Sequence, residues 1–186
     1  MTEAFVFLNE GFEEIEALTA VNVLRRGGVA VQSVSLAPQT TVTGGRGITV
    51  VADLDLAGFQ AAYAQAPSQA VLILPGGPGT KGYFEGPKAT AFEALVKAHH
   101  ADQRPIAAIC AAPTVLDAWG ILAGRTAVCY PSLRLPSANP GRHPVETDGS
   151  LITARGPATS MAFALAILRT LKGDAIQTEV ANQLLV

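Results

Sequence analysis

The sequence predicts a three-layer α/β fold, in which helices cover both faces of a mainly parallel β-sheet. Three short apolar segments have the composition of strands buried on both faces: Ala4–Leu8, Ala70–Leu74 and Ile106–Ile109. Segments with helical patterns alternate with these strands along the chain. No internal repeat or low-complexity linker divides the 186 residues, so we expect a single domain over residues 1–186.

The first half of the chain opens with the strand Ala4–Leu8, followed by a loop and by a helix that starts at Glu13–Glu16 and runs to about Arg26. Acidic residues in the first turn of this helix and arginines in its last turn complement the helix dipole. The helical period predicts an inward stripe of Ile15, Leu18 and Val21, continued by Leu24 or Arg25. The next expected elements are a strand at 29–36, a hairpin around Gly44–Gly47, a partly helical connector from 53 and the strand 70–74.

The second half is organised around the strand Ile106–Ile109, which leads through Cys110 directly into a helix. Pro113 suits the first turn of that helix, because its missing N–H is no loss there, and we expect the helix to end near Gly120. The other expected elements are a helix at 88–101, a brief strand at 127–129, an irregular segment at 132–143, a turn at 148–149, a strand at 151–154 and helices at 158–171 and 175–184.

Cys110 is the strongest candidate for a catalytic residue. A side chain at a sharp strand-to-helix corner stands exposed at the carboxyl end of its strand. The free amides at the start of the following helix stabilise a thiolate. This arrangement is that of a nucleophile elbow with cysteine in place of serine. The simpler alternative is that Cys110 is a buried small hydrophobic residue, since packing alone accounts for most free cysteines.

Ligands of parallel sheets bind at the carboxyl ends of the strands, so residues that follow other strands are candidate partners of Cys110. Glu16 could hydrogen-bond to the sulfur or relay its proton, although a first-turn acid that complements the helix dipole is the simpler interpretation. Gly76 and Gly77 could form an oxyanion hole with the amide of Ala111, or could simply form a tight turn.

Three further residues are candidates for substrate binding: Tyr130, Arg46 and Arg155. Tyr130 follows a brief strand whose end we expect at the same edge of the sheet. For the two arginines, an anion site beside the pocket and an ordinary solvated charge both remain open.

Composition and motifs exclude several classes of function. The net charge of −2 offers no field that would attract nucleic acid or an anionic membrane, and no apolar run has membrane-spanning length. Two cysteines make no disulfide framework, and the sequence shows no signal peptide, so we expect a cytoplasmic protein. Phosphate-loop and dinucleotide motifs are missing and the three histidines are scattered, so we expect neither cofactor nor metal.

Four motifs, taken in order, resemble the DJ-1/ThiJ/PfpI superfamily over nearly the whole chain: Glu13-Glu14-Ile15-Glu16, Leu74-Pro75-Gly76-Gly77, Ala107-Ala108-Ile109-Cys110-Ala111-Ala112-Pro113 and Arg155-Gly156-Pro157-Ala158-Thr159-Ser160. The resemblance is closest to the branch of the Parkinsonism-associated deglycase and the bacterial ThiJ-like proteins. It implies a flavodoxin-like sandwich, a homodimer, an acid at Glu16 that contacts Cys110, and oxyanion amides at Gly76, Gly77 and Ala111. A composition of 49% hydrophobic and 15% charged residues also fits a self-associating subunit.

Members of this superfamily are described as cofactor-independent glyoxalases, deglycases, oxidative-stress sensors, chaperones and peptidases. The peptidase-like relatives carry a histidine directly after the cysteine, where this chain has Ala111, and the Parkinsonism-associated protein has one where this chain has Tyr130. A peptidase is therefore disfavoured. We expect a glyoxalase or deglycase that acts on small 2-oxoaldehydes or their adducts through Cys110 and Glu16, with an oxidisable sensor or chaperone as the alternative.

Overall fold

The computed structural model describes residue 1, residues 3–85 and residues 88–186. Its centre is a six-stranded sheet with the order β2-β1-β5-β6-β10-β9. Five of these strands are parallel, and the edge strand β9 is antiparallel to β10. The strands span Ala4–Leu8 (β1), Val31–Ser35 (β2), Val71–Leu74 (β5), Ile106–Ile109 (β6), Val145–Asp148 (β9) and Leu151–Ala154 (β10). The predicted mainly parallel α/β fold is confirmed.

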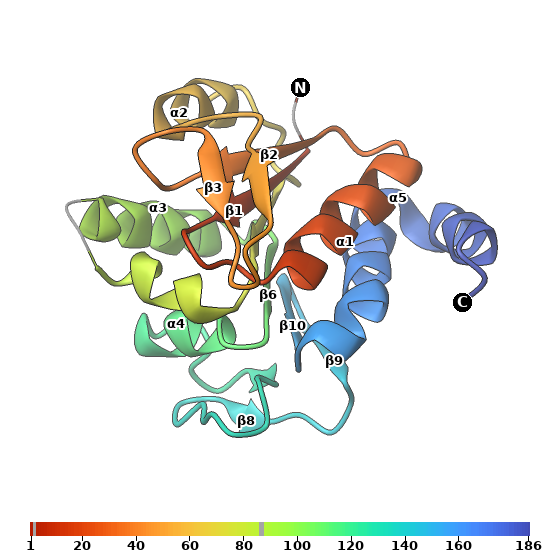
Figure 1. The fold of residues 1–186 in the computed structure, drawn as a ribbon. Helices are drawn as coiled ribbons and strands as arrows, with labels where there is room; N and C mark the ends of the chain where they lie inside the picture. Colours follow the sequence, from red (N-terminus) through yellow and green to blue (C-terminus); the bar gives the residue numbers. More distant parts are fainter. Residues whose placement is uncertain (2, 86–87) are drawn as a thin grey trace.

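Helices cover both faces of the sheet, as Figure 1 shows. One face carries α1 and α5, and the other carries α2, α3 and α4. Side chains of β1 alternate between the two layers: Val6 and Leu8 belong to the core under α1 and α5, and Phe5 and Phe7 to the other core. The helices span Glu14–Arg26 (α1), Leu56–Tyr63 (α2), Ala89–Ala101 (α3), Pro113–Ala118 (α4) and Ser160–Gln183 (α5), with short 3₁₀ helices at Pro78–Tyr83 (η1) and Pro157–Thr159 (η2).

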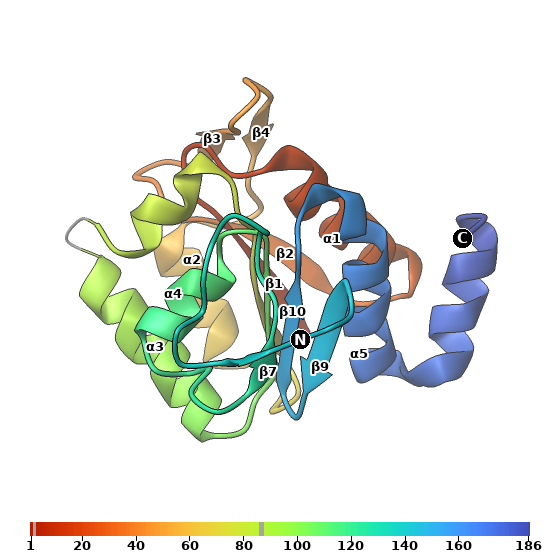
Figure 2. The ribbon, with the colours of Figure 1, turned by 90° about the horizontal axis from the view of Figure 1, so that it is seen from below.

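Two small sheets lie outside the main one. The strands β3 (Thr41–Thr43) and β4 (Thr49–Val51) form the predicted hairpin, which projects from the molecule in Figure 2. Hydrogen bonds from Gly11 N to Thr43 O (2.8 Å) and from Gly45 N to Phe12 O (2.8 Å) tie this hairpin to the loop before α1. The second small sheet pairs β7 (Thr126–Ala127) with β8 (Asn139–Pro140), so part of the segment predicted to be irregular is a short strand.

The predicted inward stripe of α1 is wrong at its start and correct at Leu24, which is fully buried, while Val21 is partly buried against the core. Ile15 and Leu18 are 56% and 40% exposed, whereas the buried face contains Ala17 and Ala20. The small side chains of Ala17 and Ala20 let the first half of α1 lie close to its neighbours, whereas Val23 and Leu24 fill the buried face of the second half. At the other end of the chain, the two predicted helices are confirmed: α5 consists of two helical parts that are separated by a kink at Gly173 (φ 82°). Its last part, dark blue in Figure 2, turns away from the sheet.

Candidate active site at Cys110

Cys110 occupies a strained corner between β6 and α4. Its φ of 64° is in the left-handed region, which costs a residue other than glycine on the order of 1–2 kcal/mol. The corner is fixed from both sides, since the Cys110 amide donates to Ala154 O (2.9 Å) and its carbonyl accepts from Tyr130 N (2.8 Å). Strain held in this way is typical of a functional position. The backbone fits the predicted strand-to-helix corner, but the expectation of an exposed side chain is wrong, because Cys110 is only 9% exposed.

Two backbone amides converge on the Cys110 sulfur. The N–H groups of Gly77 and Ala111 both hydrogen-bond to it, and both lower its pKa. Gly77 must be glycine, because its φ is 90° and a Cβ there would lie 2.7 Å from the amide nitrogen of Glu13. Two of the three predicted oxyanion amides are therefore brought together at the thiol.

Gly76 differs from the prediction. Its amide donates to Oε2 of Glu16 (2.8 Å), so in this conformation it is not available to a substrate oxygen. A Cβ at Gly76 would lie 2.7 Å from Cβ of Cys110 and 2.9 Å from the Ala111 amide nitrogen. Gly76 therefore positions the acid and allows the cysteine corner to come close.

Glu16 is buried, with 1% of its surface exposed, and its position is set from two directions. Its backbone amide donates to the side chain of Glu13, the N-cap of α1 (2.8 Å), and its Oε2 accepts from Gly76. The other oxygen, Oε1, is buried without a conventional hydrogen-bond partner in the described part of the chain. Burial raises the pKa of Glu16 to about 7, against the opposing effects of the Gly76 amide and the Cys110 thiol.

Glu16 and Cys110 act as one titrating pair. The pKa of Cys110 is raised to about 12, first by burial and then by the negative charge of Glu16, and the amides of Gly77 and Ala111 only partly offset this. The amides favour the thiolate, as predicted, but burial and the negative charge of Glu16 outweigh them. Because two adjacent negative charges are disfavoured, the pair retains one proton between pH about 7 and about 12. A thiolate near neutral pH requires that Glu16 hold that proton.

Cys110, 9% exposed, opens into a cavity of about 290 Å³, here called the Cys110 pocket. Two of the predicted substrate-binding residues, Arg46 and Tyr130, line it. Tyr130 and the cysteine meet at Gly156, where an added Cβ would lie 3.3 Å from the tyrosine ring and 3.9 Å from Sγ. Arg155 is absent from the lining of this pocket. Its Nη2 instead donates to the carbonyl of Arg142 (3.1 Å), and it borders a neighbouring cavity.

Sequence reasoning missed Glu14, which it treated as an ordinary first-turn acid. The side chain is buried, and its Oε1 accepts from the amides of Arg46 (2.6 Å) and Ile48 (3.4 Å) in the β3–β4 turn. Gly44 lets the carboxylate pass, because a Cβ at that position would lie 2.4 Å from it. Glu14 thus holds the hairpin, and with it Arg46, against the pocket. The sequence does show a glycine-rich turn whose backbone amides need a hydrogen-bond acceptor. Such a turn does not identify the residue that supplies the acceptor.

Within the described residues, no group of three or more histidine, cysteine, aspartate or glutamate side chains is arranged to hold a metal ion. None of the helices in those ranges combines the length and the apolar character of a transmembrane span.

Comparison with known proteins finds one family throughout. The model of the DJ-1/PfpI family matches residues 2–170. The chain is 36% identical to the Parkinson disease protein 7 homolog of Danio rerio, over 98% of this chain and 96% of that protein. It is 32% identical to the glutathione-independent glyoxalase DJR-1.2 of Caenorhabditis elegans, over 95% of this chain and 89% of that protein. The structure of oxidized Toxoplasma gondii DJ-1 superposes with a TM-score of 0.87 and 30% identity, covering 100% of this chain and 98% of that one.

Proposed function

The chain belongs to the DJ-1/PfpI family, and from that premise we propose that it is a cofactor-independent glyoxalase or deglycase-type enzyme that acts on 2-oxoaldehydes or their adducts. One observation carries the proposal: a buried carboxyl, Glu16, shares a proton with a strained cysteine, Cys110, at the floor of a small pocket. The glyoxalase named among its relatives, DJR-1.2, supports the same class of reaction.

The proposed reaction starts from the state in which Glu16 carries the proton and Cys110 is a thiolate. The sulfur forms a bond to the aldehyde carbon, the carbonyl π electrons move to oxygen, and Glu16 protonates that oxygen to give a hemithioacetal. Glu16, now a carboxylate, removes the proton from the same carbon, and the resulting enediol is reprotonated on the neighbouring carbon. The product is a thioester of a 2-hydroxy acid. Water hydrolyses it, which releases the acid and restores the thiol.

Other residues of the Cys110 pocket stabilise and orient the substrate in this scheme. In this scheme the amides of Gly77 and Ala111, which hydrogen-bond to the sulfur, would also stabilise the negative charge that develops on the oxygen of the attacked carbon. Arg46 supplies a positive charge at the pocket wall for the carboxylate product, and Tyr130 forms part of the wall on the Gly156 side. A volume of about 290 Å³ is at the small end for ligand pockets and suits a small dicarbonyl.

The test is conversion of methylglyoxal to lactate by the purified chain. We expect Cys110→Ser and Glu16→Gln each to lower kcat/KM by at least about a hundredfold, because the first removes the nucleophile and the second the proton carrier. Glutamine keeps an oxygen for the Gly76 amide, so circular dichroism and the melting temperature should change little. Cys129→Ser is the matched control and should retain activity. Activity that survives in both site variants would contradict the mechanism.

An oxidative-stress sensor is the second candidate. The environment of Cys110 supports it, since two amides and a protonated Glu16 could hydrogen-bond a sulfinate formed on the sulfur. A structural relative, Toxoplasma gondii DJ-1, is described in an oxidized form. Either role needs a reduced thiol at rest, which fits the cytoplasm as the compartment of action.

We also propose that the chain forms a homodimer through α1. Ile15 and Leu18 are large, exposed and one turn apart on this helix, and Val21 continues the same stripe. A second copy would cover this apolar surface. Light scattering should therefore give twice the mass of 19.2 kDa, and Leu18→Glu should shift the protein towards the monomer. A monomeric mass in the unmodified chain would exclude the dimer.

A further inference from the structure

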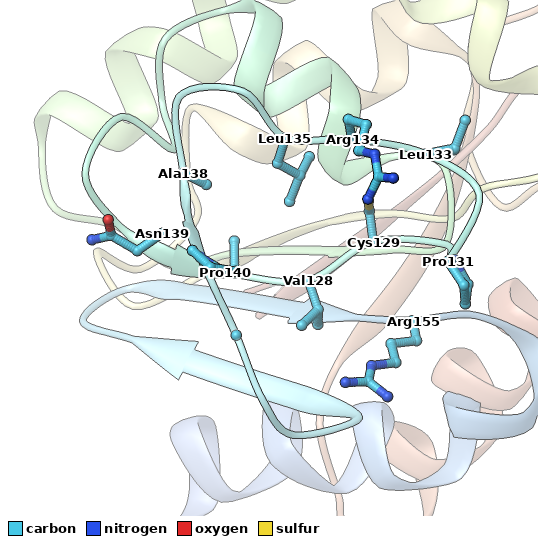
Figure 3. A pocket seen from close by; sticks show the side chains of 12 residues that line it. Val128, Cys129, Pro131, Leu133, Arg134, Leu135, Ala138, Asn139, Pro140 and Arg155 are labelled. Atoms are coloured by element: carbon cyan, nitrogen blue, oxygen red, sulfur yellow. The ribbon is translucent and has the colours of Figure 1, made fainter.

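A second and larger cavity lies beside the Cys110 pocket. Its volume is about 500 Å³, and its walls come from the chain between β7 and Gly141 and from Arg155; we call it the Arg134 cavity. Figure 3 shows the side chains of Arg134 and Arg155 on opposite sides, with Cys129 and Val128 between them. Apolar side chains form much of the remaining lining: Ala127, Leu133, Leu135, Ala138, Pro131 and Pro140.

The two guanidinium groups of this cavity have no carboxylate partner in the part of the chain that the structure describes. The five ion pairs found there use other cations. Within the described residues, the guanidinium of Arg155 donates to the carbonyl of Arg142 (3.1 Å) and to no carboxylate. Residues 118–145, which supply most of the walls, hold three arginines and no acidic residue, in a chain whose net charge is −2. The cavity is therefore a local concentration of positive charge without an ion pair among the described residues.

Acidic groups flank this segment, but other donors already occupy them. Asp117 accepts hydrogen bonds from Ser137. Glu146 accepts from the backbone amides of residues 142 and 143. Asp148 accepts from Arg125 and Thr126. None of the three forms an ion pair with Arg134 or Arg155. An anion that enters the cavity would thus meet two guanidinium groups that have no carboxylate partner among the described residues.

We propose that the Arg134 cavity is a binding site for a small organic anion, a carboxylate or a phosphate monoester with an apolar body. Guanidinium groups bind both kinds of anionic head in a planar, bidentate manner, and Arg134 and Arg155 offer two of them from opposite walls. The apolar lining between them suits the body of such a ligand. This assigns Arg155 to an anion site separate from the Cys110 pocket.

The two cavities are neighbours but not one site. Leu133 borders both, and the turn in which its amide donates to Tyr130 O (2.8 Å) stands between them. Arg46 belongs to the Cys110 pocket and Arg134 to the second cavity. Variants of these two residues therefore tell which site takes up an anion.

The experiment titrates the full chain with 2-naphthoate and follows both calorimetric binding and protection of Cys129 from N-ethylmaleimide, read by peptide mapping. We expect saturable binding that protects Cys129 and that weakens at least about tenfold in Arg134→Gln and in Arg155→Gln, since each loses a charged donor. Arg142→Gln, a nearby arginine outside the lining, and Arg46→Gln should bind as the unmodified chain does. Neutral 2-naphthalenemethanol should bind much more weakly, and a phosphate monoester, 2-naphthyl phosphate, should compete with naphthoate.

Three results would overturn the proposal. One is the absence of saturable binding by either anion. Another is binding of the neutral alcohol as tight as that of naphthoate, which would make the site merely apolar. The third is loss of binding in Arg46→Gln with retention in both Arg134→Gln and Arg155→Gln, which would move the anion to the Cys110 pocket.

Discussion

Cys110 and Cys129 lie in adjoining cavities on either side of one turn, and their surroundings differ in kind. Both thiols have a pKa raised mainly by burial. Cys110 sits at a left-handed corner, receives two amide hydrogen bonds and faces Glu16, whose own pKa is raised to about 7. Cys129 donates weakly to the carbonyl of Tyr130 (3.6 Å), and the charges that act on it come from Asp117, which raises its pKa, and Arg134, which lowers it.

The comparison teaches that a raised pKa does not by itself separate a catalytic thiol from an inert one. What distinguishes Cys110 is a neighbouring carboxyl group, Glu16, that can accept the thiol proton directly at near-neutral pH. In the described residues Cys129 has no such hydrogen bond to a carboxyl: its thiol donates to Tyr130 O, and Oδ1 of Asp117 accepts from the backbone amide and hydroxyl of Ser137. The reactivity proposed for Cys110 therefore resides in a pair of residues.

The largest expected effect concerns this pair. In the unmodified chain, the rate of alkylation of Cys110 by iodoacetamide should rise through pH about 7, where the pair loses its first proton. In Glu16→Gln no acid remains to take the proton, so the step near pH 7 should vanish. One titration, between about 9 and about 12, should replace it, because burial still raises the pKa but the negative charge is gone. At pH 8 the rate in the unmodified chain should have levelled off, whereas the rate in the variant should still rise about tenfold per pH unit.

Peptide mapping across a pH series measures both thiols in the same sample, so Cys129 serves as the internal control. Its profile should be the same in the unmodified chain and in Glu16→Gln, because Glu16 is not among the groups that shift its pKa. A step near pH 7 that persists in the variant would show that Glu16 is not the partner of Cys110. The contrast between the two thiols would then rest on exposure alone.

Local patterns predicted much of this site. The apolar strand, Cys110 and Pro113 predicted a sharp corner, and the same short stretch carries the strain and the Ala111 amide. The position of Glu16 in the first turn of a helix after β1 placed it at the correct edge of the sheet. Such features depend on a few consecutive residues and on the rule that parallel strands present their carboxyl ends together.

Contacts between distant parts of the chain could not be predicted from the sequence in this way. The Gly76 amide bonds to a carboxylate 60 residues away, and Glu14 holds the amide of Arg46 32 residues away. Which face of α1 is buried depended on how closely alanines let it approach α5, a matter of packing that helical periodicity does not contain. The sequence identified most participants of the site but not which donor serves which acceptor.

A smaller effect tests whether the contrast extends to oxidation. Dilute hydrogen peroxide should oxidise Cys110 at least about tenfold faster than Cys129 at pH 7.5, because only Cys110 has an acid that both accepts its proton and can then hydrogen-bond the sulfinate. Intact mass followed by peptide mapping gives the oxidation state of each thiol. Glu16→Asp, which keeps the acid but shortens its reach, should lower the Cys110 rate and leave Cys129 unchanged. Equal oxidation of both thiols, or of neither, would remove the sensor role and would leave the enzymatic proposal to stand on the methylglyoxal assay alone.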